Sequence, residues 1–332
     1  MSELIFITGA TGFIGAQTVE NALKAGYRVR LSVRKAEQEA VVRSRYPEFQ
    51  DHIETIVIAD LSKPESFNTA LKDVDYVFHI ASPMPKDGGD IHLDYVEPAV
   101  QATLSILKSA LAFEKIKKVS VVSSALALSP VDSLIRKDFI TVKENNGEVF
   151  PVDLSANFPD GFIGGAVKYT ASKILAHQAT RDFLKNNNPQ YKLITIHPVF
   201  VMGHSLIQDT DKDIGGMNAM LWLSLFSEKP AIGNAWVDVH DVAEAHIKAL
   251  TADLKSGTEI LLSTSAPWGD VASYVKEKYP SLGCKLQPPF EGGWDVETPT
   301  ADKILGLKWR SYQSIIDDVV NQQLSLKAKS SV

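Results

Sequence analysis

Short apolar runs alternate with longer amphipathic segments through roughly the first 200 residues of the chain. The runs are rich in Val, Ile and Phe and are bounded by turn or cap residues, which is the pattern of β-strands. Several are apolar at every position, as expected for parallel strands covered by helices on both faces. We predict strands at Leu4–Thr8, Arg28–Val33, Ile53–Ile58, Tyr76–Ile80, Lys118–Val122 and Leu193–His197.

The segments between these strands carry the 3.6-residue periodicity of helices. We predict helices at Gly12–Ala25, Ala36–Arg45, Tyr95–Phe113 and Tyr169–Lys185. Regular strand–helix alternation indicates βαβ units. The expected fold class is therefore α/β, with a doubly wound parallel sheet of the Rossmann type.

The pattern loosens after His197, where a smaller C-terminal domain is expected. We assign residues 1–200 plus about 233–250 to the large domain, about 201–232 and 251–326 to the small one, and 327–332 to a frayed tail. The elements expected in this half are a loop at 203–216, an apolar helix at Met217–Phe226, a strand at Ala235–Val237, a helix at His240–Leu250, a strand at 259–262, a helix at Gly269–Lys278, a loop at 288–294, and helices at Pro299–Leu305 and Tyr312–Leu324.

The composition excludes several classes of protein. Hydrophobic residues make up 45% and charged residues 22% of the 332 residues, which excludes wholesale disorder. The net charge of −6 and the lack of a long basic run argue against a nucleic-acid partner. The single cysteine, Cys284, cannot form an internal disulfide. Without a signal-peptide core or an apolar stretch of about 18 residues, a cytoplasmic protein with no membrane partner is expected.

A glycine-rich turn follows the first strand and begins the first helix. Its sequence is Thr8-Gly9-Ala10-Thr11-Gly12-Phe13-Ile14-Gly15. The first glycine permits a tight turn, the second lets backbone approach a pyrophosphate, and the third lets the helix pack closely on the strand. The helix N-terminus then presents free N–H groups to the phosphates. We predict a dinucleotide site whose contacts here are Gly9, Thr11, Gly12, Phe13, Ile14 and Gly15.

The end of the second strand bears on which dinucleotide is bound. An acidic residue there would accept a hydrogen bond from the ribose 2′-OH of NAD. This strand instead ends in Arg34 and Lys35, which suit a 2′-phosphate, although two solvated surface charges are the alternative. Asp60, after the third strand, is placed to accept from the adenine amino group or, alternatively, to cap the next helix. The expected cofactor is NADPH/NADP.

Tyr169 and Lys173 lie four residues apart on a predicted helix and therefore on one face. A free tyrosine has a pKa of about 10, and a cation within a few Å can lower it by about 1–3 units. Ser123 and Ser124 end the fifth strand, at the edge where ligands bind in such sheets. Tyr274 and Lys278 have the same spacing but follow no serine-bearing strand, so we predict a solvated helix face for them.

The order of these motifs resembles the short-chain dehydrogenase/reductase superfamily in its extended form. Within it, the chain is most similar to the dihydroflavonol reductase-like group, which includes plant flavanone-alcohol reductases and yeast methylglyoxal/aldehyde reductases. Besides the glycine turn, Ser123-Ser124 and Tyr169-x-x-x-Lys173, the matching residues are Asp60-Leu61, His79-Ile80-Ala81-Ser82-Pro83, His197-Pro198-Val199, Val237–Ala243 and Leu305-Gly306-Leu307.

The resemblance implies roles for individual residues. Tyr169 would be the proton donor, Lys173 would lower its pKa and bind the cofactor ribose, and Ser124, which precedes Ala125, would be the catalytic serine. Pro198 and Val199 would meet the nicotinamide carboxamide through backbone groups. Further cofactor contacts are expected at Leu61, Ala81 and Ser123.

The implied activity is NADPH-dependent reduction of a carbonyl compound. The small domain would recognise the substrate, and an apolar pocket wall is predicted from Met84, Leu126, Phe162, Trp222 and Phe226. Because Met217–Phe226 is apolar nearly all round, a buried core helix is the favoured alternative for that segment. We expect no metal, since His240 and His246 do not share a helix face, and a monomer or homodimer.

Three other functions stay open. A sugar-nucleotide epimerase or dehydratase would use the same scaffold with tightly held NAD. A nucleotide-sensing regulator would lack the active-site tyrosine, which this chain has. An alcohol dehydrogenase would run the same site in the opposite direction, and Arg34 tilts the expectation toward reduction.

Overall fold

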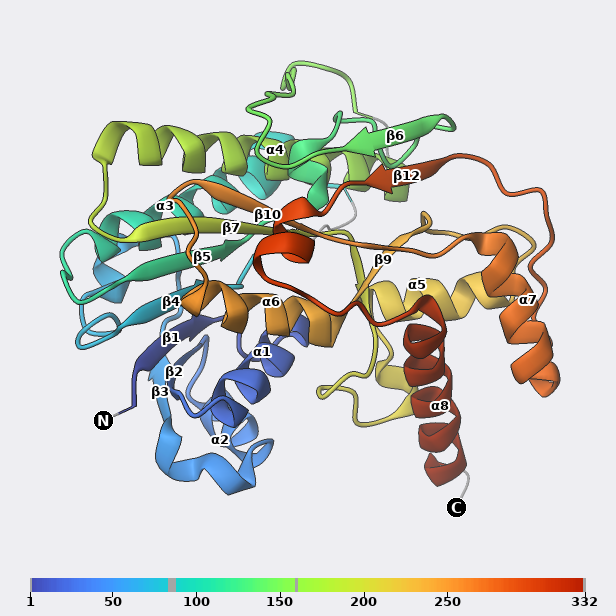
Figure 1. The fold of residues 1–332 in the computed structure, drawn as a ribbon, viewed down its shortest axis with the longest axis horizontal. Coiled ribbons are helices and arrows are strands. Elements are labelled where there is room, and N and C mark those ends of the chain that lie inside the picture. Colours follow the sequence, from blue (N-terminus) through green and yellow to red (C-terminus); the bar gives the residue numbers. More distant parts are fainter. Residues whose placement is uncertain (1, 83–87, 159–160, 331–332) are drawn as a thin grey trace.

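A seven-stranded parallel sheet forms the centre of the computed structural model, which describes residues 2–82, 88–158 and 161–330 (Figure 1). The strand order is β10-β7-β5-β4-β1-β2-β3. The strands are β1 (Leu4–Thr8), β2 (Arg28–Val33), β3 (Ile53–Val57), β4 (Tyr76–His79), β5 (Lys118–Val122), β7 (Lys192–Pro198) and β10 (Thr258–Leu262). The predicted fold class is confirmed.

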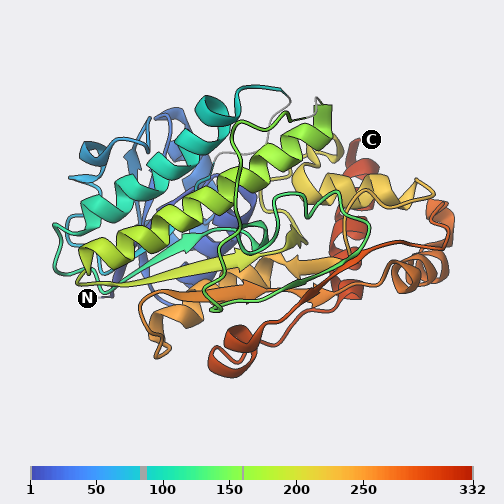
Figure 2. The same ribbon diagram turned by 90° about the horizontal axis from the view of Figure 1, so that it is seen from above.

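Helices cover both faces of this sheet. Figure 2 shows α3 (Glu97–Ala110) and α4 (Gly161–Asn187) side by side on one face. The opposite face carries α1 (Phe13–Lys24) and α6 (Val239–Thr251), while α2 (Glu37–Ser44) links β2 to β3. Strand β1 shows why its pattern is continuously apolar. Consecutive residues, such as Phe6 and Ile7, point to opposite faces of the sheet and belong to separate buried clusters. Both are fully buried.

The strand order reverses at β1: β2 and β3 lie on one side of it, and β4 with the later strands lies on the other. β1 pairs with β2 on one side and β4 on the other, and Thr8 of β1 lies opposite His79 of β4. Ligands of doubly wound sheets bind outside the carboxyl ends of the strands at such a reversal point. A ligand site is therefore expected at the carboxyl end of β1.

The C-terminal part adds a second layer of structure on the right of Figure 1. Strands β8 (Phe200–Met202), β9 (Ala235–Asp238) and β11 (Thr264–Ser265) form a small sheet. Around it pack α5 (Gly216–Leu225), α7 (Trp268–Lys278) and α8 (Tyr312–Ser330). These elements bury one apolar cluster, the C-terminal cluster, which includes Trp236 and Trp268. The two rings meet edge-to-face, with centroids 5.1 Å apart.

Several strand assignments differ from the prediction, and β8 and β11 of the small sheet were not predicted. Residues 258–262, expected in the small domain, form the edge strand β10 of the main sheet. β6 (Phe139–Val142) was not predicted, and it pairs in parallel with β12 (Gly293–Val296). The loop expected at 288–294 is therefore wrong at its last two residues. β6 shows only four alternating positions, and β12 starts next to Gly292, so neither pattern is long enough to indicate a strand.

Two helices are longer than predicted. α4 begins at Gly161 rather than Tyr169, because packing overrides the low helix propensity of the glycines in its first turns. The expected frayed tail is helical as far as Ser330. There Lys327 places its ammonium 4.9 Å from the centroid of the Trp222 ring, which ties the end of α8 to α5.

None of the helices in the described ranges is both long and apolar enough to cross a membrane.

Candidate active site

Two glycines of the turn after β1 are required by the packing of the protein itself. Gly9 has a φ of 78°, and a Cβ there would lie 2.7 Å from the backbone nitrogen of Ala81. A Cβ on Gly15 would lie 2.0 Å from the carbonyl oxygen of Gly9. The turn therefore packs directly against the end of β4, and α1 packs directly against the turn.

Gly12 differs, because no packing contact among the described residues requires it to be glycine. It is exposed, has a φ of −90°, and a Cβ there would meet only the Gly9 oxygen at 3.4 Å. It also precedes α1, whose N-terminus has no side-chain cap. An open backbone approach to uncapped helix N–H groups fits a pyrophosphate. Thr11 is half-buried beside it, and Phe13 and Ile14 begin α1 and pack on the core.

We expect Gly15→Ala to lower the free energy of unfolding by about 1–3 kcal/mol, because the new methyl group overlaps backbone that cannot move aside cheaply. Urea denaturation measures the effect. Gly269→Ala is the matched control, since Gly269 also lies in the first turn of a helix and a Cβ there meets nothing within 4 Å. Equal stabilities for the two variants would contradict the packing role.

Arg34 and Lys35 lie exposed at the carboxyl end of β2. The Gln38 side chain accepts hydrogen bonds from both of their backbone N–H groups, at 3.0 and 3.1 Å. Neither side chain forms an ion pair with another described residue, so both are available to an anion. Asp60 accepts from the backbone and hydroxyl of Ser62, and these hydrogen bonds lower its pKa. Asp60 is thus a turn cap, while adenine contacts by Asp60 and the half-buried Leu61 stay predictions.

The ends of β1 and β4 are joined by polar contacts. The Thr8 hydroxyl accepts from the Ala81 N–H at 3.2 Å and lies 3.0 Å from His79 Nδ1. His79 is 1% exposed, and burial lowers its pKa to about 4, so it is neutral near pH 7. These contacts hold Ala81 beside the glycine turn, as a cofactor contact at that position requires.

Tyr169 and Lys173 share one face of α4, as predicted. The Lys173 Nζ lies 5.3 Å from the centroid of the Tyr169 ring and donates to the Ser82 Oγ at 2.8 Å. Burial lowers the pKa of Lys173 to about 8 and raises that of Tyr169 to about 12. The predicted lowering of the tyrosine pKa is therefore not seen in the protein alone. A hydroxyl that stays protonated near neutral pH can act as a proton donor.

The two serines at the end of β5 face different surroundings. Ser123 lines one small cavity together with Ala81, Ser82 and Lys173. The Ser124 Oγ accepts from the Leu126 N–H at 3.3 Å, which leaves its own hydrogen free to donate. The Ser124 carbonyl accepts from His197 Nδ1 at 3.0 Å. Ser82 and His197 belong to motifs of the sequence, but the sequence contains no signal for these contacts.

The remaining predicted residues are the two nicotinamide contacts at the end of β7 and the residues of the predicted substrate pocket. Pro198 ends β7 and Val199 follows it, with the Val199 N–H donating to the Leu262 carbonyl at 3.2 Å. Met84 and the side chain of Phe162 lie outside the described residues. Leu126 is buried in the turn after Ser124.

Trp222 and Phe226 meet edge-to-face, with ring centroids 5.2 Å apart, and pack on the C-terminal cluster. α5 buries Leu221 and Leu225 but leaves Leu223 59% exposed. It is therefore a partly exposed helix of that cluster, and its role as a substrate wall stays a prediction.

The second Tyr-x-x-x-Lys pair is not a simple solvated face. Lys278 donates to the Tyr274 hydroxyl at 2.8 Å and to Asp317 of α8 at 2.7 Å. The pair therefore links α7 to α8.

Asp238, His240 and Asp318 form a separate polar cluster, whose donor atoms lie within 4.8 Å of one another. Asp238 Oδ1 accepts from the His240 N–H and ring nitrogen, both at 2.8 Å, which makes it the N-cap of α6.

A family model described as NAD-dependent epimerase/dehydratase matches residues 5–262. The ketoreductase sphI of Aspergillus fumigatus is 36% identical over 330 residues, covering 97% of each chain. An uncharacterized oxidoreductase of Schizosaccharomyces pombe is 31% identical over 331 residues, covering 96% of each. The crystal structure of the yeast methylglyoxal/isovaleraldehyde reductase Gre2 with NADPH superposes with a TM-score of 0.83, at 26% identity, over 98% of this chain and 99% of that one.

Proposed function

This chain belongs to the NAD-dependent epimerase/dehydratase family, in the extended short-chain dehydrogenase/reductase group, and we propose that it is an NADPH-dependent reductase of aldehydes or ketones. The observation that carries the proposal is the convergence of Ser123, Ser82 and Lys173 on one cavity at the carboxyl ends of β4 and β5, with Tyr169 one helical turn away. Ser124 follows on the same strand end.

The residues present fit the cofactor. The backbone around Gly12 and the N-terminus of α1 would hold the pyrophosphate, Arg34 the 2′-phosphate, and Lys173 the ribose. The chemistry supplied by bound NADPH is hydride transfer to the carbonyl carbon. Everything else in the reaction is positioning and proton transfer by side chains of this chain.

Two hydroxyl groups would act on the carbonyl oxygen. Negative charge develops there as the carbon is reduced, and the hydroxyl groups of Ser124 and Tyr169 would stabilise it by hydrogen bonding. Tyr169 then donates its proton to complete the alcohol. With a pKa of about 12, raised by burial, the Tyr169 hydroxyl carries its proton near neutral pH.

The names of similar proteins support the substrate class. One relative is called a ketoreductase, and the structural neighbour is called a methylglyoxal/isovaleraldehyde reductase. The purified chain is therefore assayed for NADPH and NADH consumption with aldehydes, diketones, aryl ketones, keto esters and flavanonols. We expect net NADPH oxidation with at least one of these classes. Tightly bound NAD with no net oxidation of NADPH would instead favour an epimerase or dehydratase.

We expect Arg34→Ser to raise the KM for NADPH by about 10–100-fold while changing the KM for NADH by less than about 3-fold. Charge-assisted hydrogen bonds of about 1.5–3 kcal/mol to the 2′-phosphate are lost, and NADH lacks that group. Steady-state kinetics with both cofactors measure the change. Lys35→Ser is the matched control and is expected to have a smaller effect, and equal losses for both cofactors would contradict the assignment.

A further inference from the structure

A cavity of about 20 Å³ lies between α3, α4 and the sheet, behind Lys173. A buried water molecule needs about 10–15 Å³ and two to four polar partners. The cavity therefore has room for one water. Its lining includes Ala81 and Ser82 after β4, Ser123 after β5, Lys173 and His177 of α4, and Thr195 of β7.

His177 presents a buried acceptor that no other described group uses. It lies one turn after Lys173 on α4 and is 4% exposed. Its Nε2 is 2.9 Å from Glu259 Oε1. Because a carboxylate can only accept, Nε2 carries the hydrogen, and burial lowers the pKa of His177 so that the ring stays neutral. Nδ1 is then an acceptor, and it has no hydrogen-bond partner in the part of the chain that the structure describes.

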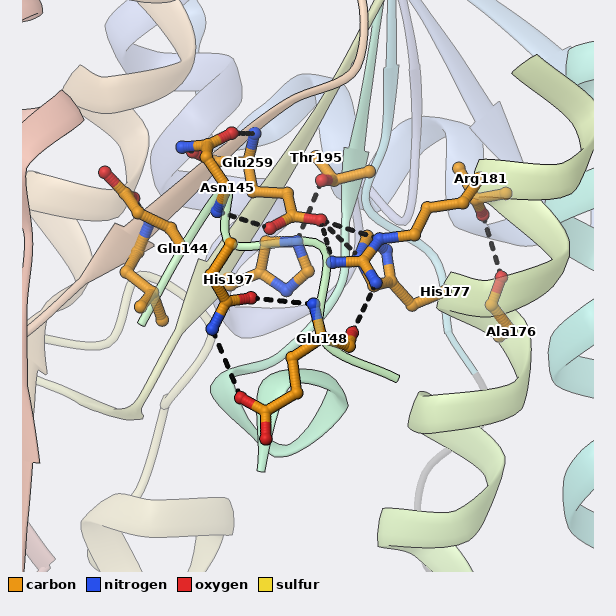
Figure 3. Close-up of polar contacts among 12 residues, drawn as sticks. Glu144, Asn145, Glu148, Ala176, His177, Arg181, Thr195, His197 and Glu259 are labelled. Carbon is orange, nitrogen blue, oxygen red and sulfur yellow. Dashed lines mark hydrogen bonds and ion pairs between the residues drawn. The ribbon is translucent and has the colours of Figure 1, made fainter. Parts of the chain in front are cut away.

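The orientation of His177 is held from behind by a buried ion pair. Figure 3 shows the Glu259 carboxylate of β10 facing both His177 and Arg181. Arg181 Nε donates to Glu259 Oε1 at 2.8 Å, and the Asn145 N–H donates to Oε2 at 2.7 Å. Burial raises the pKa of Glu259, but hydrogen bonds from His177 and Arg181 outweigh it and lower the pKa to about 2. The carboxylate therefore stays charged and keeps His177 in one tautomer.

We propose that His177 is a positioning residue for Lys173 and acts through one water molecule bound in this cavity. The water would accept a hydrogen bond from Lys173 Nζ, which can only donate, and would donate to His177 Nδ1, which can only accept. This polarity fits one water between the two residues. The functional consequence rests on the proposed reductase activity, in which the Lys173 ammonium lies beside Tyr169.

In the part of the chain that the structure describes, the other titratable groups around Lys173 are neutral or already paired. On α4 these are Tyr169 and Arg181, and Arg181 is paired with Glu259 of β10. Burial lowers the pKa of His79 of β4 to about 4 and that of His197 of β7 to about 3, so both are neutral. The lining residues of α3 carry no charge. The ammonium therefore depends on hydrogen bonding to offset its burial.

The first test does not depend on activity. A high-resolution crystal structure of the full chain without cofactor is expected to show a water peak within hydrogen-bond distance of both Lys173 Nζ and His177 Nδ1. A dry cavity, or a water that contacts only one of the two atoms, overturns the proposal. If the chain proves not to reduce carbonyl compounds, the proposed function fails while this structural result still decides the inference.

The second test uses the pH dependence of kcat. Removing the water's acceptor with His177→Leu leaves the ammonium less well solvated, so the alkaline loss of activity is expected about one pH unit lower than in the wild type. His177→Asn restores an acceptor near the Nδ1 position and is expected to recover most of the shift. His246→Leu removes a different buried histidine, on α6, and is expected to leave the profile unchanged.

Other outcomes count against the positioning role. An unshifted profile in His177→Leu, or equal shifts in the Leu and Asn variants, overturns it. If the Leu variant does not fold, the Asn variant decides alone: a profile like the wild type's, with a water still bridging to Lys173, supports the proposal, and a shifted profile overturns it.

Discussion

Tyr169→Phe is expected to lower kcat by about 10²–10⁴-fold, because the variant loses the only hydroxyl on that ring that can donate a proton to the developing alkoxide. The binding of NADPH is expected to change by less than about 2-fold, since Lys173 and the glycine turn are untouched. Steady-state kinetics measure the turnover, and fluorescence titration with NADPH measures the binding.

Tyr274→Phe is the matched control for this variant. Tyr274 has the same spacing to a lysine, but its hydroxyl bonds Lys278 and Asp317 between α7 and α8. Its loss is expected to leave kcat near that of the wild type. A Tyr169→Phe enzyme with a nearly normal rate would show that the proton comes from another group.

Arg181→Met is expected to lower the free energy of unfolding by about 3–5 kcal/mol, because it leaves a buried carboxylate without its cation. The Glu259 side chain is 4% exposed, and its oxygens are held by His177, Arg181 and the Asn145 N–H. Met keeps most of the apolar stem of arginine, so the change is chiefly one of charge. Urea denaturation at pH 7 measures the difference.

The pH dependence of this difference has a definite sign. The pKa of Glu259 is about 2 when folded, against an ordinary value of 4.5, so its stabilisation is present above pH 4.5 and is lost as the pH falls toward 2. The gap between wild type and Arg181→Met should therefore narrow over that window. Lys192→Met, which breaks the exposed pair with Asp253, is the control and is expected to cause no measurable change. An equal loss in both variants would contradict the buried role.

The main sheet was largely predictable because its strands are buried on both faces. β1, β2 and β5 have the predicted bounds, because a glycine or polar residue follows directly after each of them. The glycine turn was predictable for a similar reason. Its requirements are local: Gly9 and Gly15 answer contacts made within a few residues or with the adjacent strand.

The edge of the sheet was not predictable, because its partners are distant in sequence. The side chain of Asn145 bonds the backbone of Glu259 in both directions, 114 residues away. Glu144 likewise accepts from the Leu261 N–H and, at 2.7 Å, from the Thr300 N–H. These side chains cover the open edge of β10, which would otherwise expose unpaired backbone. No local periodicity carries that information.

The candidate site shows the same division. The spacing of Tyr169 and Lys173 on one helix predicts their shared face, and the structure has it. The donation from Lys173 to Ser82 joins residues 91 positions apart, and the contact of His197 with the Ser124 carbonyl joins two strand ends. The tautomer of His177 depends on the carboxylate of Glu259, which lies on β10. Such roles follow only from the folded arrangement.

The most direct test of the proposed activity is the transfer of deuterium from NADPH labelled at the nicotinamide C4 to a carbonyl substrate. The account predicts an alcohol with one deuterium on the former carbonyl carbon for each NADPH oxidised, and almost none with Tyr169→Phe. An unlabelled product, or activity that proceeds with retained NAD and no net oxidation of NADPH, would contradict it.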